Sequence, residues 1–396
     1  MLLDILEEHL EETEILWSSR RITMRSPNLD LRGLAALEAR LSAHLEGLAL
    51  GARESRESLE AALTGCDTDR AFAAAAALLT TRDPGARQGV RQALAVSLPP
   101  ARRGITEALC HMPLEDDTRA ALEIQLERSA GLDPAAIEVL SFHRCLPDGN
   151  LALAVPGGDR ETRRAAARAI GRMGGRADWA QWLVGDDDQA VRDLALQAAV
   201  RCGLPWAHRK LRLVCGDGER VSPESLRLLA CLGDRSDIEL LRTCAHRHEL
   251  GDAAVAGLGT LGYTGCVDAL MEVVGDARLA RAAGRAFKRI TGLEPPVIAE
   301  QSSGLEIEDA TFEDLRPIPD AGATRALWRE RRAGFDAHIR WRDGEPLETG
   351  RWKQAPHLGD LLTRREELTR LWMQEPALFP KLELDAPVAR QRAVTA

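Results

Sequence analysis

The densest set of potential metal ligands in the sequence is Cys244-x-His246-x-His248, with Cys231 thirteen residues upstream. Thiolate and imidazole groups are the ligands that zinc prefers. In a helix, however, side chains two positions apart point about 200° apart around the axis, so these three cannot face one ion unless the helix ends there. We therefore expect Cys244 in the core and both histidines near a solvated helix end, without a metal.

Three other motifs could indicate an enzyme, but each has a simpler structural explanation. His143-x-Cys145 has the residue types of a base and a nucleophile, yet the two side chains diverge on a helix. The glycine string at 257–262 lies inside a helical pattern and not after a strand, so it lacks the context of a nucleotide-binding loop. The acidic runs at 115–117 and 186–188 fit helix starts, where the helix dipole favours negative charge. We predict no catalytic residue, no cofactor and no metal.

Tryptophan and arginine side chains remain as candidates for binding a protein partner. Tryptophan is enriched in binding hot spots, although a core position is the simpler explanation for the central tryptophans. Half of the tryptophans lie in residues 323–396. The candidate partner-binding residues are Trp179, Trp182, Trp206, Arg209, Arg212, Arg242, Trp341 and Trp352.

Composition limits what surrounds these residues. The chain has 396 residues with 4% aromatic side chains and many Ala, Leu and Arg residues, which favours an all-α fold over a strand-rich one. The net charge of −9 argues against sequence-independent binding to nucleic acid or anionic lipid. The eight cysteines form no CxxC pair, and acidic residues interrupt the apolar runs at the start. We therefore expect free thiols, no signal peptide, no membrane span and a cytoplasmic location.

A repeated helix end is the strongest pattern in the sequence. The segments ARAIGRMGG, LQAAVRCGL, LRLLACLGD and VAGLGTLGY share apolar positions one and four residues before a glycine. A fixed period near 30 residues predicts a right-handed solenoid of antiparallel helix pairs, with Leu229 and Leu258 at equivalent core positions. Glycine commonly ends a helix in the left-handed conformation, which we expect at each repeat. The repeat glycines are Gly174, Gly203, Gly233, Gly262 and Gly292.

The central repeats resemble HEAT repeats, especially the short kind also found in phycobilin lyases. The resemblance rests on Asp187-Asp188-x-Ala190-Val191-Arg192 followed by LALQAAVRCG and covers roughly residues 54–292. It implies that Asp188 and Arg192 tie successive repeats together. Over nearly the whole chain, EEHLEETEILWSSR, LRGLAALEARLSAHLEGL, LARAAGRAFKRITGL and ALWRERRAGF resemble an uncharacterised proteobacterial family of HEAT-repeat proteins often encoded near type VI secretion genes.

These patterns divide the chain into four parts. Residues 1–50 form an N-terminal helical hairpin, since leucines recur at helical spacing on both sides of a break at Ser26-Pro27-Asn28. Residues 51–292 form the HEAT-like solenoid. Residues 293–322 are an acidic linker that contains proline, and residues 323–396 are a mostly helical segment that caps the repeats or docks a partner.

Two classes of function follow. In the first, the protein is a non-catalytic scaffold that binds protein partners, and the family resemblance implies an accessory role in type VI secretion, with secretion-system or effector components as partners. In the second, the fold is that of a HEAT-like enzyme, resembling a chromophore lyase or a DNA glycosylase. A glycosylase needs a continuous basic surface, which the sequence does not show on the second helices of the repeats. We therefore expect a scaffold.

Overall fold

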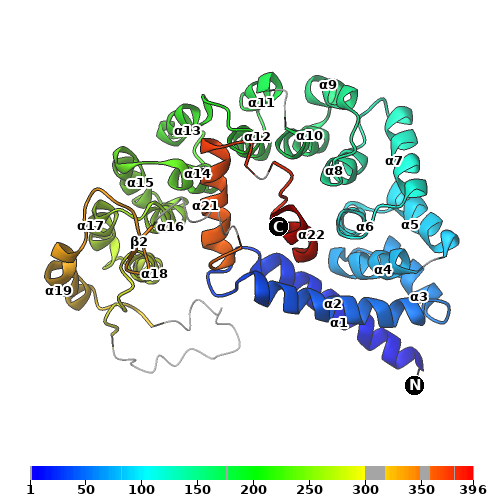
Figure 1. Ribbon diagram of the computed structural model, residues 1–396, viewed down its shortest axis with the longest axis horizontal. Coiled ribbons are helices and arrows are strands. Elements are labelled where there is room, and N and C mark those ends of the chain that lie inside the picture. Colours follow the sequence, from blue (N-terminus) through cyan, green and yellow to red (C-terminus); the bar gives the residue numbers. More distant parts are fainter. Residues whose placement is uncertain are drawn as a thin grey trace. The chain divides into compact units, whose positions relative to one another are not determined.

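The computed structural model describes residues 2–81, 83–174, 177–298, 317–347, 357–378 and 380–395. The prediction of an all-α protein is confirmed in this part of the chain (Figure 1). Its one sheet is a two-stranded hairpin of β1 (Trp341–Arg342) and β2 (Glu345–Pro346). None of the described helices is both long enough and apolar enough to span a membrane.

Contacts divide the chain into two compact units. Unit 1 comprises Met1–Leu204 together with Trp352–Ala396, and unit 2 comprises Pro205–Arg351. Unit 1 is therefore discontinuous in sequence. The sequence pattern predicts one solenoid over residues 51–292 and one segment over residues 323–396, whereas this division separates each of them between the two units.

Unit 1 begins with an antiparallel hairpin, α1 (Leu2–Thr23) and α2 (Leu31–Leu50). Two alternating sets of helices follow. One set forms a row in which each helix packs against the next, α4 (Thr68–Thr80), α6 (Pro99–His111), α8 (Pro134–Phe142), α10 (Arg160–Met173) and α12 (Gln189–Arg201). The helices between them are α3 (Arg56–Thr64), α5 (Pro84–Val96), α7 (Asp116–Arg128), α9 (Asp148–Gly157) and α11 (Ala177–Leu183).

The end of the chain completes unit 1. The helices of this part are α21 (Leu361–Gln374) and the short helix α22 (Val388–Thr395), and the described residues between them contain turns and no regular strand. In Figure 1 these elements, drawn in orange and red, lie inside the curve that the row from α4 to α12 makes. Helix α21 packs on α12, and α22 packs on α2.

Aspartates start several of these helices, as the sequence predicts. Asp83 and Asp133 precede prolines at the first helical position and accept hydrogen bonds from Gly85 N and Ala136 N. Asp188 caps α12 in the same way and also accepts a bidentate contact from Arg164 on α10, with N to O distances of 3.1 and 3.0 Å. Asp188 therefore links neighbouring repeats, whereas Arg192, for which the HEAT resemblance implies the same role, donates to the carbonyl oxygens of Asp186 and Asp187 in its own repeat.

Unit 2 repeats the arrangement with α14 (Pro223–Leu232), α16 (Gly251–Leu261) and α18 (Ala280–Thr291) as its packed row. Leu229 and Leu258 are fully buried there, which confirms their predicted core positions. The other helices are α13 (Ala207–Gly216), η1 (Arg235–Asp237), α15 (Ile238–Ala245), α17 (Thr264–Val273), α19 (Ala321–Arg331) and η3 (Arg332–Gly334).

The hairpin β1–β2 covers the C-terminal ends of two helices of unit 2. Arg340 donates to the carbonyl oxygens of Leu261 and Thr260, both at 2.7 Å. The backbone amide of Asp343 donates to Arg289 O at 2.7 Å. These contacts satisfy carbonyl groups that a helix end leaves without an internal partner.

Four of the five repeat glycines end their helices with a positive φ, the exception being Gly233, whose φ is −64°. The expectation of a left-handed end is therefore wrong at Gly233. The backbone of Gly233 is extended and leads directly into the capping box of Asp234 and Asp237, which opens η1. No left-handed residue is therefore needed to turn the chain after α14. Of the predicted linker, residues 299–316 lie outside the described residues.

Candidate protein-binding site

Polar contacts between distant parts of unit 1 join the C-terminal segment, residues 357–378 and 380–395, to α1 and to the row of helices. Four arginines make these contacts from separate places in the sequence, and we call them the arginine row. They are Arg20 on α1, Arg144 just after α8, Arg172 on α10 and Arg201 on α12.

Three members of the arginine row bind the backbone of residues 380–386, which precede α22. Arg144 donates to the carbonyl oxygen of Pro380, and Arg201 Nη2 donates to that of Leu382 at 2.6 Å. Arg20 Nη2 donates to the carbonyl oxygens of Asp385 and Ala386, at 3.0 and 3.2 Å. Such contacts hold the backbone without regard to the side chains that it carries.

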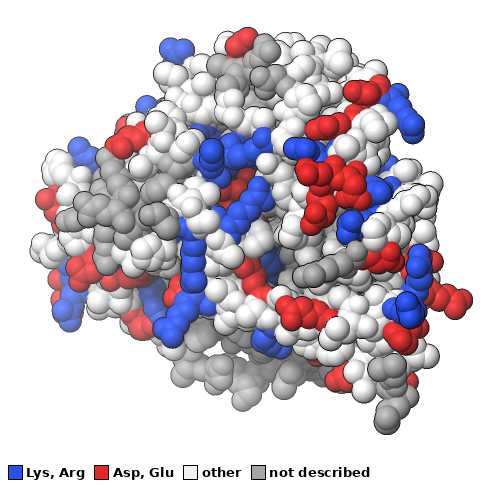
Figure 2. Space-filling model, turned by 45° about the vertical axis from the view of Figure 1, so that its right-hand side comes forward, with Lys and Arg blue, Asp and Glu red and all other residues white. Residues whose placement is uncertain are grey.

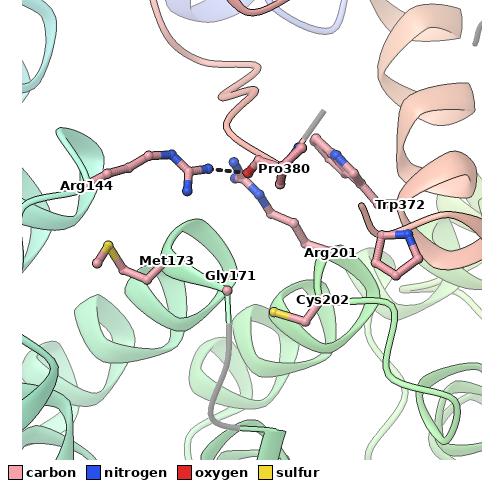
Figure 3. Close-up of a pocket in the computed structure, with 9 residues that line it drawn as sticks. Arg144, Gly171, Met173, Arg201, Cys202, Trp372 and Pro380 are labelled. Carbon is pink, nitrogen blue, oxygen red and sulfur yellow. Dashed lines mark hydrogen bonds between the residues drawn. The ribbon is translucent and has the colours of Figure 1, made fainter. Parts of the chain in front are cut away.

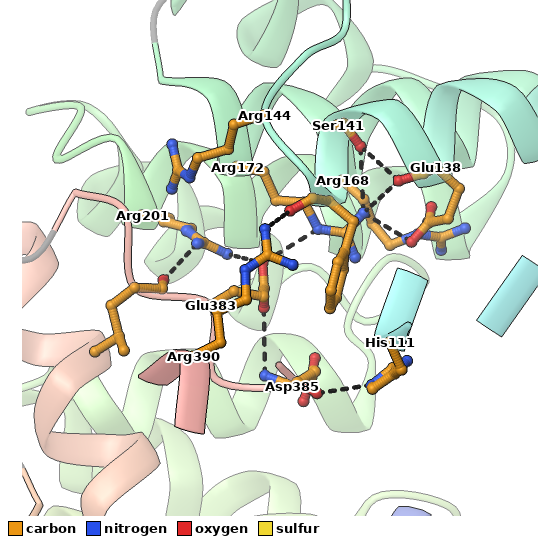
Figure 4. Close-up of polar contacts among 12 residues, drawn as sticks. His111, Glu138, Ser141, Arg144, Arg168, Arg172, Arg201, Glu383, Asp385 and Arg390 are labelled. Carbon is orange, nitrogen blue, oxygen red and sulfur yellow. Dashed lines mark hydrogen bonds and ion pairs between the residues drawn. The ribbon is translucent and has the colours of Figure 1, made fainter. Parts of the chain in front are cut away.

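A buried carboxylate fixes the register of this stretch. Glu383 Oε2 accepts from Arg201 Nη1 at 2.9 Å and from Arg172 Nε at 3.2 Å (Figure 4). Glu383 is 8% exposed, and burial alone would raise its pKa. The positive charges of Arg201 and Arg172 outweigh burial and lower the pKa, so Glu383 is ionised at neutral pH.

A second carboxylate, on the repeat side, holds Arg172 in place. Arg172 Nη1 lies 2.8 Å from Glu138 Oε1, and Arg168 Nε lies 2.7 Å from Glu138 Oε2. Burial opposes ionisation of Glu138, but the two arginines more than compensate and lower its pKa to about 2. The network is therefore fully charged at neutral pH, and removal of one member leaves buried charge uncompensated.

The apolar side chains of this segment face α21 and not the arginine row. Leu382 and Leu384 are buried in a cluster with Leu368, Leu371 and Trp372 of α21. Leu382 and Leu384 therefore face α21, whereas the carboxylate of Glu383 between them faces the arginine row.

Contacts with the first helices fix the far end of the stretch. Glu38 Oε2 accepts from the amide of Val388 at 2.8 Å, and Glu38 Oε1 accepts from Arg20 Nε at 2.9 Å. His111 Nε2 lies 3.0 Å from Asp385 O. Burial and the neighbouring charge of Arg20 lower the pKa of His111 to about 4, so this imidazole is neutral at pH 7.

The predicted partner-binding residues lie elsewhere, and they belong to both units. In unit 1, α11 carries Trp179, which is half-buried, and Trp182, which is 52% exposed. In unit 2, Trp206 is half-buried at the start of α13, Arg209 is exposed, and Trp341 is buried in β1. Trp352 lies outside the described residues.

The two remaining predicted arginines are engaged in ion pairs within unit 2. Arg212 Nε lies 2.6 Å from Asp237 Oδ1, which links α13 to η1. Arg242 lies 2.7 Å from Glu239 and 3.1 Å from Glu272, so it bridges α15 and α17. Their contacts join consecutive repeats and compete with any contact to a partner.

The sequence contains a signal for part of the arginine row, although the motifs singled out at first do not include it. Arg172 and Arg201 both stand two positions before a repeat glycine, whereas unit 2 has Cys231 and Thr260 at the equivalent positions. An arginine at a fixed repeat position places guanidinium groups on one face of neighbouring helices. Their acidic partner Glu383, which lies 182 residues beyond Arg201 in the chain, has no such signal.

The cysteine and histidine residues considered as metal ligands do not converge on one point in the described residues. The described part of the chain contains no group of three or more His, Cys, Asp or Glu side chains placed to hold a metal. Cys244 is buried, while His246 and His248 are exposed. No protein-family model and no curated protein sequence matches the chain. The indications of function therefore come from the contacts of unit 1.

Proposed function

We propose that the protein is a non-catalytic scaffold. It binds extended, acidic segments of its protein partners. The observation that carries this proposal is the way unit 1 holds its own chain between Pro380 and Ala386. Arginine side chains bind the backbone carbonyls of Pro380, Leu382, Asp385 and Ala386 there, and a buried carboxylate sets the register. A segment of another protein with alternating apolar and acidic residues satisfies the same groups.

Protein is a better partner than nucleic acid for this surface. The arginine row supplies the positive charge that a DNA glycosylase would need, but the carboxylate of Glu383 pairs with Arg172 and Arg201, and the backbone of Asp385 lies against Arg20. Figure 2 shows basic and acidic side chains side by side on the face that it draws. Paired opposite charges favour a partner that carries both signs.

The resemblance to proteobacterial HEAT-repeat proteins encoded near type VI secretion genes suggests the identity of the partner. We propose a component or an effector of that machine. On this proposal the scaffold brings proteins together and leaves any chemistry to them.

Affinity purification of the tagged full-length chain from its native organism, followed by mass spectrometry, tests the proposal. We expect reproducible recovery of secretion or effector proteins. A second arm uses the full-length variant Glu383→Gln, which weakens the contacts of the arginine row with the C-terminal segment. The matched control is Glu127→Gln, at an exposed position of α7. If Glu383→Gln recovers more partner protein than the wild type does, and Glu127→Gln does not, the arginine row is the surface that binds the partner. Recovery of nucleic acid alone from every sample contradicts the proposal.

A further inference from the structure

A small cavity of about 140 Å³ lies in unit 1 beside the point where the C-terminal segment meets the arginine row (Figure 3). Arg144 and Arg201 line it on the repeat side, together with Met173 and Cys202. Trp372 and Pro376 line it on the side of α21. A liquid water molecule takes about 30 Å³, so the space suits a small organic molecule or an inorganic oxyanion.

The cavity wall carries positive charge that the described residues do not balance. Arg144 forms no ion pair among them, and its hydrogen bond goes to the neutral carbonyl group of Pro380. The nearest carboxylate, Glu383, is already shared between Arg172 and Arg201. Arg390, close to the same cluster, donates to Phe142 O at 2.8 Å and likewise has no carboxylate in the described part of unit 1.

A neutral donor among the residues that line the α21 side of the cavity is also unsatisfied. The side chain of Trp372 is only 6% exposed, and its indole Nε1 is buried without a hydrogen-bond partner among the described residues. Arg201 lies over the ring of Trp372, 5.0 Å from its centroid. A buried donor without an acceptor is rare in native proteins and calls for a ligand or a water.

The backbone at Arg144 is held in an uncommon conformation. Its φ is +60°, in the left-handed region that is costly for a branched or long side chain. The turn that ends α8 fixes it through hydrogen bonds from Arg144 N to Ser141 O, at 3.0 Å, and from Cys145 N to Leu140 O, at 2.8 Å. This rigid turn places the guanidinium group at the cavity.

We propose that this cavity is a binding site for a small oxyanion, a carboxylate or a phosphate group, held by the guanidinium of Arg144 beside Arg201 and Trp372. A guanidinium fork recognises both kinds of oxyanion with two parallel hydrogen bonds. Burial and the nearby charge of Arg201 lower the pKa of Arg144 to about 10, which is the effect expected where a cation lacks an anion. The site shares Arg144 and Arg201 with the surface of the proposed scaffold, but its binding of a small anion needs no protein partner.

Thermal unfolding and calorimetric titration of the full-length protein test this site. The probes are inorganic phosphate and sodium acetate, with sodium chloride at equal ionic strength as the reference. We expect phosphate or acetate to raise the melting temperature of the wild-type protein above its value in chloride, because a ligand that binds only the folded state stabilises it. A rise with one probe alone identifies the group as phosphate or carboxylate.

The variant Arg144→Asn removes the charge and keeps the backbone, since asparagine is enriched in the left-handed region. We expect it to bind the active probe at least tenfold more weakly. Because the variant also loses the hydrogen bond to Pro380 O, the gain from the probe is compared with the variant's own melting temperature in chloride. Arg53→Asn, at an exposed turn of unit 1, is the matched control and should behave as wild type. Arg144→Lys keeps a point charge and should bind with intermediate affinity.

Nuclear magnetic resonance supplies a readout that a merely structural role of Arg144 would not move. The indole N–H signal of Trp372, assigned by its loss in Trp372→Phe, should shift as the active probe saturates the site. The proposal is overturned if neither probe raises the wild-type melting temperature above that in chloride. Equal gains in wild type and Arg144→Asn, or an unchanged Trp372 signal at saturation, would overturn it as well.

Discussion

The substitution Glu383→Gln removes one charge from the network that holds the C-terminal segment in unit 1. Glutamine keeps the size of the side chain but leaves Arg201 with a carbonyl group and an aromatic ring as partners. Breaking a buried ion pair typically costs about 3–5 kcal/mol. Arg172 still has Glu138 at 2.8 Å, so the lower end of that range applies. We expect a local loss of about 3 kcal/mol.

Hydrogen exchange read by mass spectrometry measures this loss where it arises. Since 1.4 kcal/mol corresponds to a factor of ten, peptides that cover α21 and α22 should lose protection by a factor on the order of 100. Helices of unit 2 serve as an internal reference and should keep their protection. The exposed control Glu127→Gln should stay within about 0.5 kcal/mol of wild type. Unchanged protection of α21 and α22 in Glu383→Gln would refute the role of the ion network.

Three further predictions concern other parts of the two units. Leu258→Asp puts a carboxylate at a fully buried position and should destabilise unit 2 by about 3 kcal/mol or more, and a wild-type melting curve would contradict this. Gly262→Ala should cost about 1–3 kcal/mol, because φ is +77° and a Cβ would lie 2.7 Å from Trp341 O; equal urea midpoints for the variant and the wild type would count against it. His111 has a pKa of about 4 in the folded protein against 6.5 in the unfolded chain. Its neutral form therefore adds about 3 kcal/mol to the free energy of unfolding above pH 6.5, and this contribution is lost as the pH falls toward 4. Stability measured from pH 7 to 4 should therefore fall less steeply in His111→Gln than in wild type, and parallel curves would disprove the assignment.

Local signals in the sequence were sufficient to predict the helices of the repeats. Asp83 and Asp133 stand before prolines, and each starts a helix where an acceptor side chain and a fixed φ favour one. Leu229 and Leu258 recur at one repeat position, and both are buried. These features depend on residues within a few turns of each other, which is the range over which periodicity carries information.

The site could not be predicted in the same way. The contact between Arg172 and Glu383 joins residues 211 positions apart. It depends on the return of the chain from unit 2 to unit 1, which no periodic pattern encodes. Tryptophan content indicated other surfaces, because the abundance of a residue type does not report which surfaces meet. At Gly233 the repeat pattern also fails to predict the backbone conformation, because the capping box after it removes the need for a left-handed residue.

The discontinuity of unit 1 has a consequence for synthesis on the ribosome. Residues 357–395 are translated after the whole of unit 2, so Arg172 and Arg201 emerge long before Glu383. At roughly 5–20 residues per second, the interval is on the order of ten to forty seconds. During that time a nascent chain exposes guanidinium groups that the finished protein covers. Chaperones or a cotranslationally bound partner thus meet a more basic surface than the mature molecule presents.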